Sequence, residues 1–296
     1  MNFADIEDQY AGYDHAAVLL QSIPYDGTST WGKGADQNFQ AFMDAAYNLE
    51  WYDIETDSEV YLRGIHVLPA IEESSSPEIV YQTVFTRTQE LIKTKKFLTF
   101  LGGEHSISMG VIKAFYQAYP DITILQIDAH ADLRPSYEGS PYNHACTVYE
   151  ASRNANLIQV GIRSMDLSEK KQMDLDRCYF AHTMQGNDTW MDASIAQMSK
   201  RVYITFDLDA FDPAIMPGTG TPEPGGLDWY TTLTYLQKVF SKREVLGFDL
   251  VELAPIEGQR ASQFLAAKLY YKMLSYKFEI QNCDGSKQLH HHSTQK

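Results

Sequence analysis

The residues Gln126-Ile127-Asp128-Ala129-His130-Ala131-Asp132-Leu133-Arg134 follow a nearly continuous apolar run that begins at Ile122. Such a run is typical of a buried strand in a parallel sheet. Three potential metal ligands, Asp128, His130 and Asp132, then occupy every second position. Because alternate side chains of an extended segment point the same way, we expect these three to converge. A solvated acidic turn is the simpler interpretation of one such triplet, but crowded buried carboxylates repel one another unless a cation joins them.

Strand and helix patterns alternate on both sides of this stretch. Apolar runs predict strands at 16–20, 97–101, 122–127, 157–160, 179–181, 202–206 and 245–251. Helical spacing predicts helices at 36–48, 79–92, 107–119, 143–154, 191–198, 229–240 and 262–276. This alternation indicates βαβ units, and therefore an α/β fold with a mostly parallel sheet flanked by helices on both faces. We interpret residues 1–280 as a single domain and the polar stretch 281–296, with His290-His291-His292, as a disordered tail.

Composition narrows the class of protein. The chain has 296 residues and a net charge of −15, with its acidic residues spread along its length. This charge argues against nucleic acid as a partner and is compatible with a cationic small molecule. The three cysteines are far apart, which fits a reducing cytosol. We expect neither a secretory signal at the acidic N-terminus nor a membrane span, because no apolar run is long enough.

Four predicted strands lead into acidic or imidazole residues, and parallel strands present ligand sites at their carboxyl ends. Besides the opening triplet these residues are His105, Asp207, Asp209 and Glu252. Each of them alone has an ordinary interpretation, as a helix cap, a turn or an ion-pair partner. Together, four aspartates and two histidines form an oxygen-rich donor set that suits manganese or a similar divalent ion.

Charge balance favours two ions over one. Two divalent cations cancel the four aspartate charges, whereas one ion would leave two negative charges uncompensated in a partly buried cleft. Two ions roughly 3.5–4 Å apart can share a water and lower its pKa, which generates a hydroxide nucleophile. The surrounding loops contain few cations apart from Arg134, so a phosphate substrate is disfavoured. Glu252 instead suits a cationic substrate such as a guanidinium, which a carboxylate can hold in bidentate fashion.

Three motifs carry a resemblance to the ureohydrolase family of arginases and agmatinases, between about residues 16 and 276. They are Leu101-Gly102-Gly103-Glu104-His105-Ser106, then Ile127 to Asp132, and then Phe206-Asp207-Leu208-Asp209-Ala210-Phe211-Asp212-Pro213 with the following residues 217–222. The resemblance implies an arginase-type fold and two Mn²⁺ ions per chain. It departs from the common family pattern at Thr205, where a serine is usual, and at Ala145, where many members have glycine.

The resemblance also implies a role for each site residue. His105 and Asp132 would bind one ion, and His130 and Asp209 the other. Asp128 and Asp207 would bridge the two ions together with a hydroxide. His144 would return a proton to the leaving amine, and Glu252 would orient the guanidinium of the substrate. The family is usually oligomeric, so we expect a homo-oligomer, either a trimer or a hexamer.

Residues 133–143 resemble the agmatinase version of the loop that selects the substrate, and Glu138 in this loop is a candidate partner for the distal ammonium of agmatine. We therefore predict hydrolysis of agmatine to putrescine and urea. Other guanidine hydrolases of the family (guanidinobutyrase, guanidinopropionase or arginase) remain alternatives. A deacetylase of similar fold would need an adjacent pair of histidines, which occurs only in the tail. A non-catalytic metal-binding protein is the remaining alternative.

Overall fold

One parallel sheet of eight strands organises the chain. The computed structural model describes residues 2–280, and the tail with its three histidines lies outside this range. The strand order is β2-β1-β3-β8-β7-β4-β5-β6, and the paired strands all run parallel. The strands are β1 (Val18–Ile23), β2 (Ile65–Val67), β3 (Phe97–Gly102), β4 (Thr123–Ile127), β5 (Asn156–Ile162), β6 (Cys178–Phe180), β7 (Arg201–Asp207) and β8 (Glu244–Val251). This architecture confirms the α/β fold expected from the sequence.

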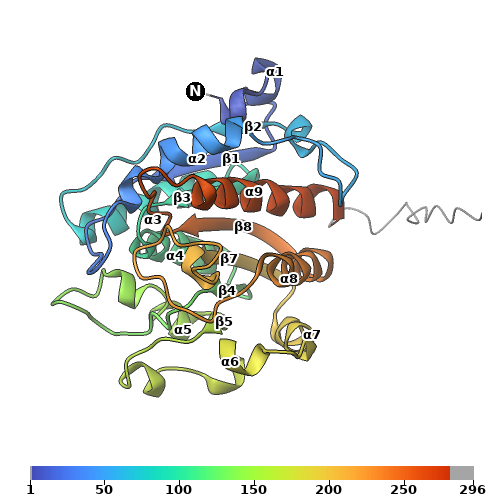
Figure 1. The fold of residues 1–296 in the computed structure, drawn as a ribbon. Coiled ribbons are helices and arrows are strands. Elements are labelled where there is room, and N and C mark those ends of the chain that lie inside the picture. The colour runs from blue at the N-terminus through green and yellow to red at the C-terminus, as the bar shows by residue number, and fades with distance from the viewer. Residues whose placement is uncertain (1, 281–296) are drawn as a thin grey trace, which may run out of the picture.

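Helices cover both faces of the sheet (Figure 1). They are α1 (Asp8–Ala11), α2 (Asn38–Tyr47), α3 (Pro77–Ile92), α4 (Ser108–Ala118), α5 (Ala151–Asn154), α6 (Ala181–Met184), α7 (Thr189–Gln197), α8 (Trp229–Lys242) and α9 (Ala261–Ser275). The core on one face includes Phe42 of α2, Leu236 of α8 and Tyr270 of α9. The core on the other face includes Val84 of α3 and Val111 of α4. The central strands are buried on both sides, which explains their continuous apolar sequences.

Side-chain caps define where two of the longer helices begin. The hydroxyl of Ser76 accepts a hydrogen bond from the backbone N–H of Ile79, and Pro77 occupies the first turn of α3. Asp228 caps α8 in the same way, with 2.9 Å between Oδ1 and the backbone nitrogen of Thr231. Each cap satisfies a backbone N–H that has no partner inside its helix.

The helix predicted at 143–154 is wrong. The structure has a 3-10 turn at His144–Cys146 and a single helical turn at Ala151–Asn154. The reason is that some backbone groups of this segment bond to the loop after β4, so that its internal bonds form separate turns and not one continuous helix. Arg134 donates to the carbonyl of Ala145 at 3.0 Å, and Val148 donates to that of Asp132 at 3.2 Å. These long-range bonds hold the segment against the end of β4.

The strand order places the predicted motifs side by side. Strands β3, β8, β7 and β4 are consecutive neighbours in the sheet, and each leads into one of the acidic or histidine motifs at its carboxyl end. No helix among residues 2–280 is long and apolar enough to cross a membrane.

Candidate metal centre

The predicted ligands converge at the carboxyl edge of the four central strands, but among the aspartates only Asp207 does so from within a strand. Strand β4 ends at Ile127, before the first ligand. Asp132 adopts a left-handed conformation with φ 51°, and Asp209 lies in a 3-10 turn. The expectation that alternate positions of a strand aim these side chains is therefore corrected, because tight turns bring them together. Glu252 is also left-handed, with φ 65°. Such strained conformations in non-glycine residues cluster at functional sites.

His105 faces three carboxylates at the centre of the site. Its Nδ1 lies 3.1 Å from an oxygen of Asp128, 3.1 Å from one of Asp132 and 3.2 Å from one of Asp207. The imidazole is only 1% exposed, and Nδ1 forms no hydrogen bond. A buried nitrogen surrounded by three carboxylates is a donor set that suits a divalent cation.

His130 forms the second half of the cluster. Its Nδ1 lies 2.9 Å from Oδ2 of Asp209 and 3.7 Å from Oδ1 of Asp128. Two overlapping groups could each hold a metal ion: His105 with Asp128 and Asp132, and Asp128 with His130 and Asp209. Asp128 belongs to both groups. The division of the ligands between two ions stays a prediction, and this geometry is compatible with it.

The electrostatics of the cluster favour bound cations. Burial, followed by the charge of Asp209, raises the pKa of Asp128 and holds that of Asp207 well above its ordinary value. Burial and the charge of Asp128 raise the pKa of Asp132 to about 7. Near neutral pH some of these carboxylates would have to carry protons. Divalent cations can replace those protons and remove the repulsion between the carboxylates.

A chain of hydrogen bonds determines which nitrogen of His105 carries the lone pair that could bind a metal ion. Nε2 lies 2.8 Å from the hydroxyl of Thr205, and that hydroxyl donates to Oδ1 of Asp249 at 2.8 Å. Because the hydroxyl hydrogen is directed at Asp249, Nε2 must carry a hydrogen and donate it to Thr205. The lone pair is thereby assigned to Nδ1, the nitrogen that faces the carboxylates. Metal-binding histidines are commonly oriented by such partners, so the residues present fit a metal centre.

Further polar contacts hold the other ligands. The side-chain amide of Gln126, a residue of β4, donates to Asp128 at 2.7 Å. Asp209 accepts from the backbone N–H of Ala129 at 3.1 Å. The guanidinium of Arg163 donates to the backbone carbonyl of Asp209 at 2.7 Å and to that of Glu223 at 2.7 Å. These contacts fix the turns that carry the ligands.

A pocket of about 330 Å³ lies over the cluster. It is lined by His105, His130, Asp132, Asp207 and Asp209, and also by His144 and Glu252. Burial, with the charges of His130 and His105 next, lowers the pKa of His144 to about 4. A neutral His144 is suited to accept a proton. The structure thus brings eight of the nine predicted site residues to one place, with Asp128 buried beneath the pocket.

Glu138 is the exception. It is exposed, has a left-handed backbone with φ 47°, and does not line the pocket. The structure therefore does not place it where it could meet a substrate bound over the cluster. Besides the cluster and Glu252, the acidic residues that line the pocket are Asp166 and Glu169. Glu169 is buried, lies 3.6 Å from Nε of Arg134, and accepts the backbone N–H of Leu133 at 2.9 Å.

Several supporting residues were missed by the sequence analysis. Gln126 and Asp249 lie inside buried apolar strands, and a polar residue in such a run needs a hydrogen-bond partner. That signal was available from the sequence. Thr205 was noted only as a departure from a family pattern. No local sequence signal marks Arg163 or Glu169, because their partners are distant in the chain.

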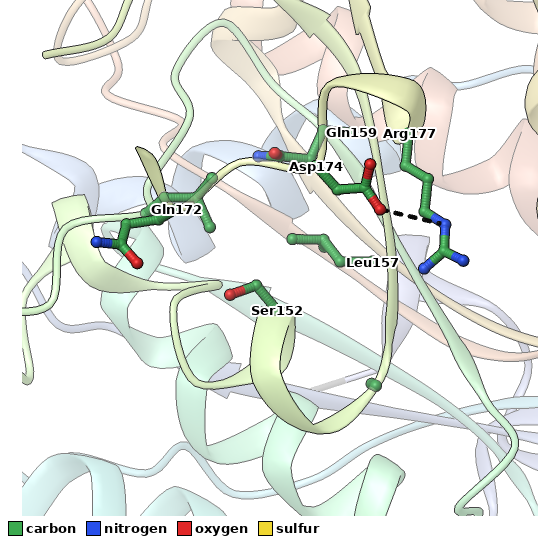
Figure 2. Close-up of a pocket in the computed structure, with 8 residues that line it drawn as sticks. Ser152, Leu157, Gln159, Gln172, Asp174 and Arg177 are labelled. Atoms are coloured by element: carbon green, nitrogen blue, oxygen red, sulfur yellow. Dashed lines mark ion pairs between the residues drawn. The ribbon is translucent and has the colours of Figure 1, made fainter. Parts of the chain in front are cut away.

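A second hollow, lined in part by Leu133, lies between α5 and the segment around Asp174 (Figure 2). Its volume is about 50 Å³, and Figure 2 shows Asp174 and Arg177 paired at one side, at 3.6 Å. This volume is suited to water and not to a substrate. We therefore assign no ligand to it.

The fold and the site together identify the class. Residues 16–275 match the model of the arginase family, and the chain belongs to this family. The chain is 35% identical over 283 residues to an N(1)-aminopropylagmatine ureohydrolase of Synechocystis, a match that covers 91% of this chain and 92% of the relative. It is 28% identical to an agmatinase of Pyrococcus horikoshii, over 91% of this chain and 95% of the relative. The crystal structure of agmatine ureohydrolase of Thermoplasma volcanium superposes with a TM-score of 0.84 at 31% identity, covering 94% and 95% of the two chains.

The family match confirms the resemblance inferred from the three motifs. The protein is accordingly a ureohydrolase of the arginase family with metal-binding histidine and aspartate groups.

Proposed function

We propose that the protein hydrolyses agmatine to putrescine and urea. The observation that carries the proposal is the pocket in which five candidate ligands of a dinuclear centre lie beside Glu252 and His144, with the sixth ligand, Asp128, buried beneath it. Two divalent cations, which we propose to be Mn²⁺, would lower the pKa of a shared water and so supply the nucleophile.

Glu252 and His144 can supply the two other functions that the reaction needs, which are binding of the guanidinium and transfer of a proton. Glu252 has one carboxylate oxygen fixed by the backbone N–H of His105 at 2.8 Å, and the carboxylate can bind the guanidinium by charge and hydrogen bonds. Water adds to the guanidinium carbon, the bond from that carbon to the alkyl nitrogen breaks, and a proton must reach the departing amine. His144 lines the same pocket and can transfer that proton.

The charges around the pocket favour a cationic substrate. Asp166 and Glu169 line its wall, and Glu223 lies 3.9 Å from Nε2 of His130. The cation in the lining, Arg134, is paired with Glu169 and stacks over the ring of Tyr137 at 4.3 Å. A substrate carboxylate would compete with Glu169 for Arg134, whereas a distal ammonium group would meet an acidic wall.

A second candidate substrate is N(1)-aminopropylagmatine, which the 35% identity to the Synechocystis ureohydrolase favours. Hydrolysis of this compound with one water would release urea and leave spermidine. The test is urea release by Mn²⁺-loaded protein from agmatine, N(1)-aminopropylagmatine, arginine, guanidinobutyrate and guanidinopropionate. We expect one of the two cationic compounds to give the highest kcat/KM. A preference for arginine or for an acidic guanidino compound would refute the proposed substrate class.

We also propose that the protein acts in the cytosol as a homo-oligomer. Trp31, Ile54 and Tyr230 are more than three-quarters exposed in the isolated chain, which supports burial of such side chains between subunits. Light scattering coupled to size-exclusion chromatography would test the oligomer, and a mass of one chain at micromolar concentration would refute it.

A further inference from the structure

The side chain of His144 is held by one hydroxyl group, that of Thr28 on the loop after β1. Oγ1 of Thr28 lies 3.0 Å from the backbone nitrogen of His144 and 3.2 Å from its Nδ1. Thr28 is 8% exposed. The backbone N–H must donate to Oγ1, so this oxygen already acts as an acceptor toward His144. Which of the two groups supplies the hydrogen between Oγ1 and Nδ1 depends on the other partner of Thr28.

That partner is Glu104, which is fully buried. Its Oε1 lies 2.9 Å from Oγ1 of Thr28 and accepts the hydroxyl of Ser106 at 2.7 Å. Its Oε2 accepts the backbone N–H of Ser106 at 2.8 Å. The carboxylate is therefore the stronger and closer acceptor for the one hydrogen of the Thr28 hydroxyl. We assign that hydrogen to Glu104.

The assignment determines the tautomer of His144. With the hydroxyl hydrogen on the side of Glu104, Nδ1 can bond to Oγ1 only by donating a hydrogen. Nε2 then keeps its lone pair. Among residues 2–280, nothing hydrogen-bonds to Nε2 of His144. The ring of Tyr137 packs against the imidazole in a T-shaped arrangement, with centroids 6.0 Å apart.

The loop that carries Thr28 is fixed against the end of β3. The backbone N–H of Gly103 donates to Ile23 at 2.8 Å, and that of Glu104 donates to Tyr25 at 2.8 Å. A Cβ atom at Gly103 would lie 1.9 Å from the carbonyl oxygen of Tyr25, so only glycine permits this approach. These backbone contacts hold the beginning of the loop that carries Thr28 against the end of β3.

We propose that Thr28, anchored by Glu104, is the positioning residue that holds His144 as its Nδ1–H tautomer. Nε2 is then the nitrogen that exchanges a proton with the departing amine. The catalytic consequence rests on the proposed function, whereas the tautomer itself does not.

The first test compares Thr28→Val, which loses the hydroxyl at nearly constant volume, with Thr28→Ser, which keeps it. The matched control is Thr88→Val, because Thr88 is also buried but its hydroxyl donates to the carbonyl of Val84 within α3. Each variant is measured with the guanidino substrate that wild-type protein hydrolyses best. We expect kcat of Thr28→Val to fall on the order of 10²-fold, the smaller end of general acid–base effects, with KM and Mn²⁺ content within twofold. Thr28→Ser and Thr88→Val should stay near wild type.

A double-mutant cycle separates positioning from structural damage. In a His144→Ala background, Thr28→Val should cause no further loss of kcat, because its effect acts through the imidazole. An equal loss in both backgrounds would overturn the proposal, and so would an unchanged kcat in Thr28→Val alone.

Nitrogen NMR of histidine-labelled protein at pH 8 gives a readout independent of activity, with the His144 signals assigned by their absence from His144→Ala. Nδ1 should show the shift of a protonated nitrogen and Nε2 that of an unprotonated one, and Thr28→Val should change this pattern. The opposite tautomer in wild type would overturn the proposal even if urea release is normal. If no substrate releases urea, the proposed function fails and the NMR result still decides the tautomer.

Discussion

Replacing Thr205 with valine should weaken one metal site and spare the other. The hydroxyl of Thr205 is the partner of His105 Nε2 at 2.8 Å, and both residues are buried. Valine would leave that N–H without an acceptor, which costs about 1–3 kcal/mol. Loss of a second-sphere partner of a metal ligand typically lowers affinity about 10–100-fold, or about 1.4–2.7 kcal/mol. The two ranges overlap near 2 kcal/mol, so we expect a loss of about 30-fold in Mn²⁺ affinity at the site that contains His105.

Competition between the protein and a fluorescent Mn²⁺ chelator measures both affinities. The site formed around His130 should change little, because His130 has no contact with Thr205 among the described residues. Thr205→Ser is the control, since it keeps the hydroxyl that orients His105, and its affinities should match wild type. Equal weakening at both sites, or a serine variant as weak as the valine variant, would refute the role assigned to this hydroxyl.

Three further predictions concern the cluster, the stability of the fold and the thiols. Asp128→Asn should abolish turnover and reduce bound Mn²⁺ below two equivalents by elemental analysis, because Asp128 belongs to both ligand groups. Lys272→Met should lower the free energy of unfolding in urea by about 3–5 kcal/mol, since it leaves buried Asp53 without the ammonium group now 2.8 Å away. Burial opposes ionisation of Asp53 but its contacts with Lys272 lower its pKa overall, so this stabilisation should be complete above about pH 4 and lost as the pH falls further. Burial raises the pKa of Cys146 and Cys178 to about 12, so peptide mapping should find both unmodified after iodoacetamide treatment of folded protein at pH 8.

The sheet and most of its elements follow from the sequence because apolar runs and helical spacing are local signals. The strand predicted at 202–206 lies within β7, and the helix predicted at 262–276 matches α9 closely. The prediction of a helix at 143–154 fails because the structure of this segment depends on distant residues. Its backbone bonds to Arg134 and Asp132, and such distant partners leave no periodic pattern in the sequence.

The identity of the ligands was predictable because they follow strands that are neighbours in the sheet. The direction of their side chains was not predictable, because it depends on the turns after those strands. Asp132 reaches the cluster through a left-handed backbone conformation, which the local sequence does not predict. Glu138 stands close to the ligands in sequence but projects into solvent, and Glu169, thirty-one residues further on, takes a place in the pocket wall instead. Loop conformation, which depends on contacts such as those of Arg163 with backbone carbonyls, decides which carboxylates reach the substrate.

The central claim is that this centre hydrolyses a cationic guanidino compound. Its most direct test is the urea released by the Mn²⁺-loaded protein from agmatine and from N(1)-aminopropylagmatine, with metal content measured on the same sample. We predict about two equivalents of Mn²⁺ per chain and stoichiometric formation of urea and the corresponding amine. Protein that contains two equivalents of Mn²⁺ and releases no urea from either compound would contradict the account.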